Sequence, residues 1–207
     1  MLVEAIQFGN GESAYSPFPK KHPVYSEESI ILHDKEKAKK LLQESGVSNF
    51  SFDILVKPDA FSQRVGEAVK AQLAEVGIQV NLKPTEVGKL TELAFSNPQY
   101  PATIARASGR PDPNSQLSLY FKESSFYNPG HHLNAEFESL LQKAAAETDE
   151  AERMSIISQA SQIVMKEDAM GIPLFFEPMI VAMANKVAGY EPNLYGKPRF
   201  PFLWIEE

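Results

Sequence analysis

The residues best suited to bind a ligand lie in one short charged segment, Arg-Ala-Ser-Gly-Arg-Pro-Asp-Pro-Asn at positions 106–114. Pro111 and Pro113 fix φ and lack an N–H, and Gly109 permits positive φ, so the segment is a shaped loop. Loops at strand ends are where α/β proteins place ligand contacts. The alternative is an ordinary strand-to-helix turn with solvated charges. The predicted ligand-binding residues are Arg106, Ser108, Gly109, Arg110, Asp112 and Asn114.

Arg106 has two candidate partners. It follows a predicted strand whose alternation puts Ala102, Ile104 and Arg106 on one side. An arginine at the end of a buried strand needs an anionic partner. That partner is either Asp112, which would staple the loop internally, or a carboxylate of the ligand. Two aromatic residues further along, Tyr120 and Tyr127, are interpreted as core or rim residues rather than as groups that stack on a ligand.

The sequence contains none of the common catalytic or metal-binding motifs. There is no cysteine, so disulfides, thiol catalysis and cysteine metal sites are excluded. The sequence has no GxSxG elbow, no phosphate-binding GxxxxGK[ST] and no GxGxxG after a strand. We therefore predict neither cofactor nor metal, while a small α/β hydrolase or transferase with an unrecognised site stays open as the alternative. None of the four histidines has a metal-ligand spacing; they are His22, His33, His131 and His132.

Length and charge set the class of protein. With 207 residues, 43% of them hydrophobic, the chain can bury one good core. The net charge of -7 and the scattered Lys and Arg argue against a nucleic-acid-binding surface. No apolar run approaches the length of a membrane span. The first residues lack a basic start and a small-residue cleavage site, so we expect no secretory signal in this sequence.

The periodicity predicts an α/β fold. A strand at 52–57, a helix from 60 to 76 and a strand at 78–83 indicate a right-handed parallel crossover. Helices are also expected at 1–6, after Asp34, after Asn134 and after Asp149, where Asp or Asn can cap the first turn. Two further strand segments, at 101–106 and 172–183, complete one predicted mixed sheet flanked by helices.

Several weak motifs occur in a specific order. Asp34 begins D-K-E-K-A-K-K-L-L-Q-E-S-G, which is similar to a recurrent D-P-x-K-A-K-x-L-L-x-E-A-G segment, and Asp149 to Arg153 match a D-x-x-x-R helix start. Between and after them come G-I-Q-V at Gly77, the G-R-P-D-P loop and G-I-P-L at Gly171. In this order the chain resembles, over almost its whole length, the C-terminal lobe of the extracytoplasmic solute-binding proteins of family 5, which serve ABC importers of peptides, glutathione and nickel.

The resemblance implies a two-lobed protein that closes on its ligand about a hinge, with the periplasmic-binding-protein-like (type II) fold. This chain would carry one lobe: residues 1–23 an inter-lobe segment, 24–188 the ligand-binding lobe, and 189–207 an aromatic tail that returns toward the first lobe. The implied partners are a peptide or peptide-like ligand and ABC transporter permease subunits. The implied location is extracytoplasmic, with the membrane reached through the transporter or a lipid anchor and with no nucleic acid bound.

The sequence departs from the peptide-binding members at two positions. Those members carry an aspartate before the Asp-Pro loop that holds the free amino group of the ligand, where this sequence has Gly109. An aromatic residue common a little earlier is Arg106 here. Loss of the aspartate removes the partner of an ammonium group, and arginines offer planar donors to carboxylates. The sequence therefore predicts a ligand with an exposed anionic group.

Overall fold

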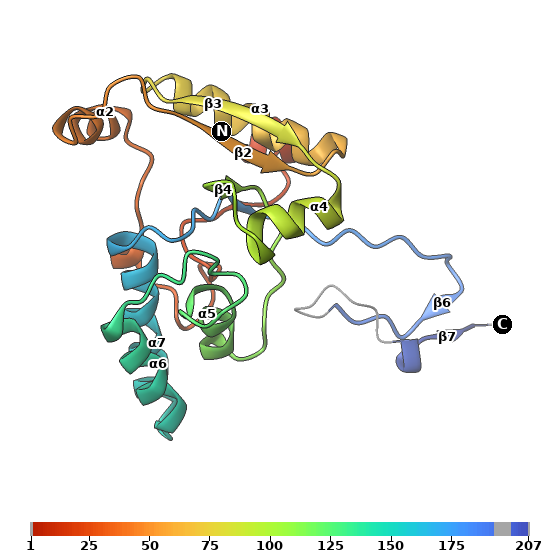
Figure 1. Cartoon of the computed structure of the whole chain (residues 1–207). Helices are drawn as coiled ribbons and strands as arrows, with labels where there is room; N and C mark the ends of the chain where they lie inside the picture. Colours follow the sequence, from red (N-terminus) through yellow and green to blue (C-terminus); the bar gives the residue numbers. More distant parts are fainter. Residues whose placement is uncertain (1, 193–199, 207) are drawn as a thin grey trace.

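The computed structural model describes residues 2–192 and 200–206. A parallel sheet with its covering helix forms one layer, and a group of three helices forms a second layer beneath it (Figure 1). A short hairpin near the C-terminus lies away from both layers (Figure 1). None of the helices in the described ranges is long and apolar enough to cross a membrane.

Three parallel strands form the sheet in the order β3-β2-β4. They are β2 (Ser51–Val56), β3 (Gln79–Pro84) and β4 (Ala102–Thr103). The helix α3 (Ala60–Ala74) connects β2 to β3, begins at the N-cap Asp59 and covers one face. A Cβ on Gly66 would lie 3.0 Å from the Leu82 side chain, so glycine lets α3 approach the sheet closely. The predicted parallel crossover is confirmed.

Two short helical segments cover the other face of the sheet. They are α4 (Val87–Thr91) and the π-helical η2 (Glu92–Ser96). Leu90 and Ala94 pack against Leu55 on the central strand, which is fully buried. The alternation of β2 thus supplies apolar side chains to both faces, as expected for a strand covered on both sides.

The predicted strands at 52–57, 78–83 and 101–106 do contribute to one sheet, but the prediction that 172–183 joins them to make it mixed is wrong. Of the segment 172–183, β5 (Phe175–Phe176) is extended and paired, and it pairs antiparallel with β1 (Glu12–Ser13) in a separate two-stranded sheet. Pro173 and Pro178 flank β5, and proline donates no ladder hydrogen bond, so the strand stays short. The main sheet of the described residues is entirely parallel.

The second layer consists of α5 (Pro113–Phe121), α6 (Ala135–Ala146) and α7 (Glu150–Gln162), which continues into the π-helical η3 (Ile163–Glu167). The N-caps Asn134 and Asp149 are confirmed. Phe18 and Val24, on either side of the predicted boundary between residues 23 and 24, are buried in the same core as these helices, and the boundary stays a prediction. The other buried members of this core include Leu117, Phe137, Leu141, Ala144, Ile157 and Val164.

Two helices near the N-terminus match their predictions in position. The first, α1 (Leu2–Gln7), buries Ile6, and a single 3-10 turn, η1 (Glu27–Ser29), precedes α2 (Lys35–Glu44). The expected apolar stripe of α2 is not buried, since Leu41 is 55% exposed. An ion pair between Lys35 and Glu75 links α2 to the end of α3.

The C-terminal hairpin pairs β6 (Val187–Ala188) with β7 (Trp204–Ile205), and η4 (Phe200–Phe202) precedes β7. Its aromatic side chains Phe200, Phe202 and Trp204 are exposed. Tyr195 of the predicted aromatic tail lies outside the described residues. The role of this tail toward a first lobe stays a prediction.

Candidate ligand-binding site

The charged loop leaves the sheet at the carboxyl end of β4 and ends where α5 begins. Residues 105–111 are all exposed, and no regular structure spans 104–110. At the carboxyl edge of a parallel sheet, such a loop presents its side chains to a ligand. The N-terminal half of the loop, which begins at Arg106, and the C-terminal half, which ends at Asn114, make different contacts with the rest of the protein.

The C-terminal half is anchored through Asp112. One carboxylate oxygen of Asp112 accepts a hydrogen bond from the Ser115 N–H at 2.7 Å and so caps α5. The other oxygen accepts from Arg153, whose Nε also donates to the Ala144 carbonyl at 3.1 Å. Arg153 therefore joins the loop to the end of α6 and to α7. Of the two candidate partners of Arg106, Asp112 is thus ruled out as a partner in this structure, because Arg153 pairs with that aspartate.

The environment of Asp112 favours its charged form. Partial burial by itself raises the pKa of this carboxyl, but hydrogen bonds from Ser115 and Arg153 outweigh that effect and leave the pKa below the ordinary value. Asn114 strengthens the same anchor, since its amide donates to the Leu141 carbonyl at 3.1 Å. Asp112 and Asn114 are thus held by the protein itself.

Arg106, in the N-terminal half, is paired across the molecule. Its Nε lies 2.8 Å from a carboxylate oxygen of Glu177, and its guanidinium lies 4.0 Å from the centre of the Phe61 ring. The side chain is 58% exposed, and its anionic partner is Glu177, which is neither of the two candidate partners. Hydrogen bonds from Ser62 are the largest causes that lower the pKa of nearby Asp59, and the charge of Arg106 contributes. No sequence pattern indicates a partner 71 positions away.

Ser108, Gly109 and Arg110 form the open part of the loop. All three are exposed, and Arg110 makes no ion pair with any residue in the described ranges. The Tyr120 hydroxyl donates to the Ser108 carbonyl at 3.4 Å, a long hydrogen bond. Burial raises the pKa of Tyr120, partly offset by that hydrogen bond and by the charge of Arg110. These residues leave donors available for a ligand.

Aromatic side chains that the sequence prediction did not assign to the site lie beside this open part. Tyr120 and Tyr127 have ring centroids 5.3 Å apart, and Phe95 lies 5.4 Å from Tyr127 and 5.5 Å from Phe126. We call these four residues the ring cluster. They come from α5, from η2 and from the loop after α5, so the periodicity of a single element does not reveal the cluster. The adjacent aromatic residues Phe126 and Tyr127 were the one sequence feature that could have indicated it.

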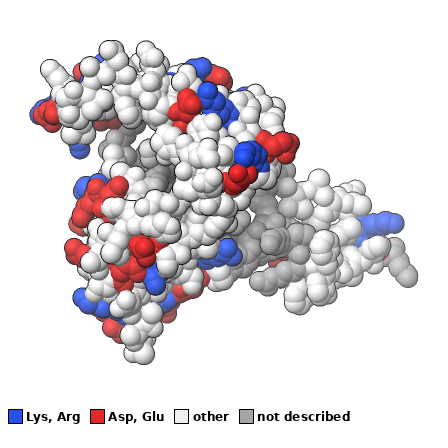
Figure 2. Space-filling model, viewed as in Figure 1, with Lys and Arg blue, Asp and Glu red and all other residues white. Residues whose placement is uncertain are grey.

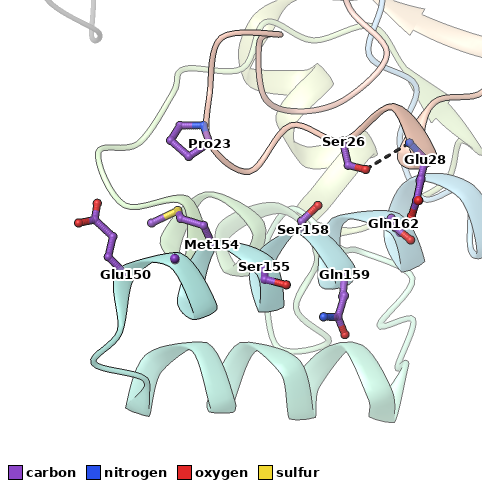
Figure 3. Close-up of a pocket in the computed structure, with 10 residues that line it drawn as sticks. Pro23, Ser26, Glu28, Glu150, Met154, Ser155, Ser158, Gln159 and Gln162 are labelled. Atoms are coloured by element: carbon purple, nitrogen blue, oxygen red, sulfur yellow. Dashed lines mark hydrogen bonds between the residues drawn. The ribbon is translucent and has the colours of Figure 1, made fainter.

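A hollow of about 840 Å³ lies elsewhere, between the 23–28 segment and α7 (Figure 3). None of the predicted site residues lines it. Glu28 and Glu150 lie toward its two ends, and its other side chains are neutral, so it offers no cation to a carboxylate. Its lining residues are Pro23, Ser26, Glu28, Glu150, Ala151, Met154, Ser155, Ser158, Gln159 and Gln162.

Acidic side chains gather on the face over α6 and α7 (Figure 2). Residues 134–168 contain eight carboxylates and three basic residues, which accounts for most of the net charge. The His132 ring lies 3.1 Å from the Asp168 carboxylate. No group of three His, Cys, Asp or Glu side chains that could hold a metal ion occurs within residues 2–192 and 200–206.

Comparison with known proteins agrees with the resemblance seen in the motifs. The family model for the bacterial extracellular solute-binding proteins, family 5 Middle, matches residues 1–128. Di/tripeptide-binding protein 4 of Pseudomonas aeruginosa strain UCBPP-PA14 is 30% identical over 203 residues, 93% of this chain and 38% of that protein. Heme-binding protein A of Haemophilus influenzae strain Rd is 27% identical over 208 residues, 96% of this chain and 38% of that protein.

Solved structures show the same similarity at the level of the fold. The ABC transporter-associated periplasmic binding protein DppA from Helicobacter pylori, solved in complex with the peptide STSA, superposes with a TM-score of 0.81 at 25% identity. The match covers 99% of this chain and 41% of that one. The chain thus spans about 40% of the length of its relatives, as one lobe of the type II fold does.

Proposed function

The chain belongs to the bacterial extracellular solute-binding proteins of family 5, and from this membership we propose that it forms the ligand-binding lobe of a substrate-binding component of an ABC importer. The family is extracytoplasmic and consists of transport solute-binding proteins rather than enzymes. The proposed partners are a peptide or peptide-like ligand and the permease subunits of the importer. No observation favours the hydrolase or transferase alternative.

Family membership carries this proposal, and the open part of the charged loop supports the position proposed for the ligand contact. Ser108, Gly109 and Arg110 are exposed at the carboxyl edge of the sheet, while Asp112 and Asn114 hold the end of the loop against α6 and α7. A loop that is held at both ends and exposed between them suits a ligand contact, because it is positioned before the ligand arrives.

The ligand contact of the loop is proposed to be Arg110 rather than Arg106. Glu177 and the Phe61 ring already engage Arg106, whereas the guanidinium of Arg110 is available for a carboxylate. Gly109 supplies no negative charge for a ligand ammonium group. We propose a ligand with an exposed carboxylate, contacted by Arg110 and by the polar groups of Ser108. Arg106, Asp112 and Asn114 position the loop.

The test is a titration of the 207-residue chain with N-acetyl-Ala-Ala, a blocked peptide that keeps its carboxylate, followed by amide NMR. One lobe supplies part of the enclosing surface, so we expect a Kd of about 1 mM, which corresponds to about 4 kcal/mol. The amide signals of Ser108, Gly109 and Arg110 should shift.

Arg110→Ala should raise that Kd roughly tenfold or more, in line with the loss of a charged hydrogen bond. Lys40→Ala is the control, because it also removes an exposed cation, 74% exposed, but on α2 and outside the loop. Equal Kd values for wild type and Arg110→Ala, or shifts confined to other parts of the chain, would contradict the proposal.

A further inference from the structure

The ring cluster is a continuous set of aromatic contacts beside the open loop. Phe126 and Tyr127 meet edge to face with centroids 5.4 Å apart, and each also contacts Phe95. Tyr120 joins the cluster to the loop, since its ring lies 5.3 Å from Tyr127 and its hydroxyl contacts the Ser108 carbonyl. Tyr120 therefore links the ring cluster to the segment that carries Arg110.

Two rings of the cluster are largely open. Phe126 is 50% exposed and Tyr127 is 42% exposed, although each is an aromatic residue that would stabilise the protein more if it were buried. Tyr120 and Phe95, the other two members of the cluster, are half-buried. An exposed aromatic surface of this kind, next to polar groups, is typical of a binding site.

Several internal hydrogen bonds hold the loop after α5, which carries Phe126 and Tyr127. Asn128 is 5% exposed, and its side-chain amide donates to the carbonyls of His132 at 2.9 Å and Lys122 at 3.2 Å. Its carboxamide oxygen accepts from the His132 N–H at 3.2 Å. The Ser125 hydroxyl accepts from the Tyr127 N–H at 3.1 Å. Because the loop is held from inside, the rings keep their positions while their faces stay in contact with water.

We infer that the ring cluster and Arg110 together select ligands that carry a planar aromatic group close to a carboxylate. Stacking on the rings of Phe126 and Tyr127 would replace water by aromatic contact, and Arg110 would bind the anion beside them. The inference rests on the proposed function and goes beyond it, since a cation alone does not distinguish one carboxylate ligand from another.

Three blocked peptides separate the contributions. N-acetyl-Ala-Phe carries both features, N-acetyl-Ala-Ala lacks the ring, and N-acetyl-Ala-Phe amide lacks the carboxylate. Titrated into the 207-residue chain, N-acetyl-Ala-Phe should bind about three- to tenfold more tightly than N-acetyl-Ala-Ala, the range expected for one aromatic contact. It should bind at least about tenfold more tightly than N-acetyl-Ala-Phe amide, which lacks the carboxylate that Arg110 binds. Its titration should shift the amide signals of Phe126 and Tyr127 as well as those of Gly109 and Arg110.

Phe126→Leu keeps an apolar side chain of similar reach and removes the ring, and it should reduce the preference for N-acetyl-Ala-Phe to less than about twofold. Phe126→Tyr should restore it. Phe50→Leu is the matched control, because the Phe50 side chain is similarly exposed, at 42%. It contacts Phe52 at the amino end of β2, whereas the charged loop leaves the sheet at its carboxyl end.

The outcomes separate the two claims. If N-acetyl-Ala-Ala and N-acetyl-Ala-Phe bind equally and Phe126→Leu has no effect, the selection of aromatic ligands is wrong while the proposed function stands. In that result the rings serve another purpose, such as contact with a further domain. If none of the three peptides shifts the signals of Ser108 to Arg110, both claims are wrong.

Discussion

The open part of the charged loop, Ser108 to Arg110, differs from the C-terminal end of the same loop, Asp112 to Asn114, in its contacts with the rest of the protein. At one end, Asp112 and Asn114 make hydrogen bonds to α5, α6 and α7 through Ser115, Leu141 and Arg153. In the open part, Ser108 to Arg110 are exposed, and the hydroxyl of Tyr120, from the ring cluster, donates to the Ser108 carbonyl. One nine-residue loop thus contains both side chains that are hydrogen-bonded to the protein and side chains whose donors are available to a ligand.

This difference shows how one segment can be both stable and ready to bind. Charged groups that are partly buried need protein partners, because removing them from water costs more than a typical hydrogen bond returns. Asp112 has such partners. Arg110 keeps its hydration and its freedom, so a ligand carboxylate does not have to displace an existing ion pair. The same reasoning separates Arg110 from Arg106, which already lies between Glu177 and Phe61.

The largest expected effect comes from removing the support beneath the anchored half. Leu117 of α5 is fully buried among the residues of the helical core. Leu117→Ala should lower the free energy of unfolding by about 2 to 5 kcal/mol, because it leaves a cavity. Chemical denaturation measures this loss. Leu41→Ala, at a leucine that is 55% exposed on α2, is the control and should change it by less than about 0.5 kcal/mol.

The second prediction concerns the anchor itself. Asp112→Ala removes the cap of α5 and the partner of Arg153, and it should cost about 1 to 3 kcal/mol. Asp112→Asn keeps a residue that caps well but loses the charge, so its loss should be smaller. An alanine variant as stable as wild type in urea denaturation would mean that the two halves of the loop do not differ in anchoring.

Acid should weaken the same anchor. The pKa of Asp112 is lower in the folded protein than its ordinary value, so its contribution to stability is present above about pH 4. The contribution is lost as the pH falls through the lower folded pKa. The difference in melting temperature between wild type and Asp112→Asn should therefore shrink as the pH decreases below about 4. A difference that grows toward low pH would show that the carboxylate is not stabilised by its partners.

The sequence predicted the regular elements well, since the capping residues Asp34, Asn134 and Asp149 and the strand periodicity act over neighbouring residues. The sequence also predicted correctly that the charged segment that begins at Arg106 follows a strand as a loop. It failed where partners are distant in the chain, as for Arg106 with Glu177 and Asp112 with Arg153. It failed again for β5, because flanking prolines do not reveal which strand pairs with the short extended segment between them. The ring cluster was missed since its members come from three elements.

A smaller loss is expected at Arg106. Its ion pair with Glu177 and its stacking on Phe61 are both largely exposed, and each contributes about 0.5 to 1 kcal/mol at most. Arg106→Ala should thus cost about 1 kcal/mol in stability, while Arg106→Lys should recover part of it. Peptide affinity should change less than in Arg110→Ala. A loss of binding at Arg106 with no loss of stability would assign the ligand carboxylate to Arg106 instead.

The most direct test of the account measures stability and binding on the same two variants, Arg110→Ala and Asp112→Ala. For Arg110→Ala we expect a melting temperature within about 2 °C of wild type, since an exposed residue changes stability by about 0.5 kcal/mol at most. Its Kd for N-acetyl-Ala-Phe should rise about tenfold or more. Asp112→Ala should instead lower the melting temperature by about 2 to 12 °C. If Arg110→Ala melts as early as Asp112→Ala and binds the peptide as wild type does, the open half of the loop is structural and the account is contradicted.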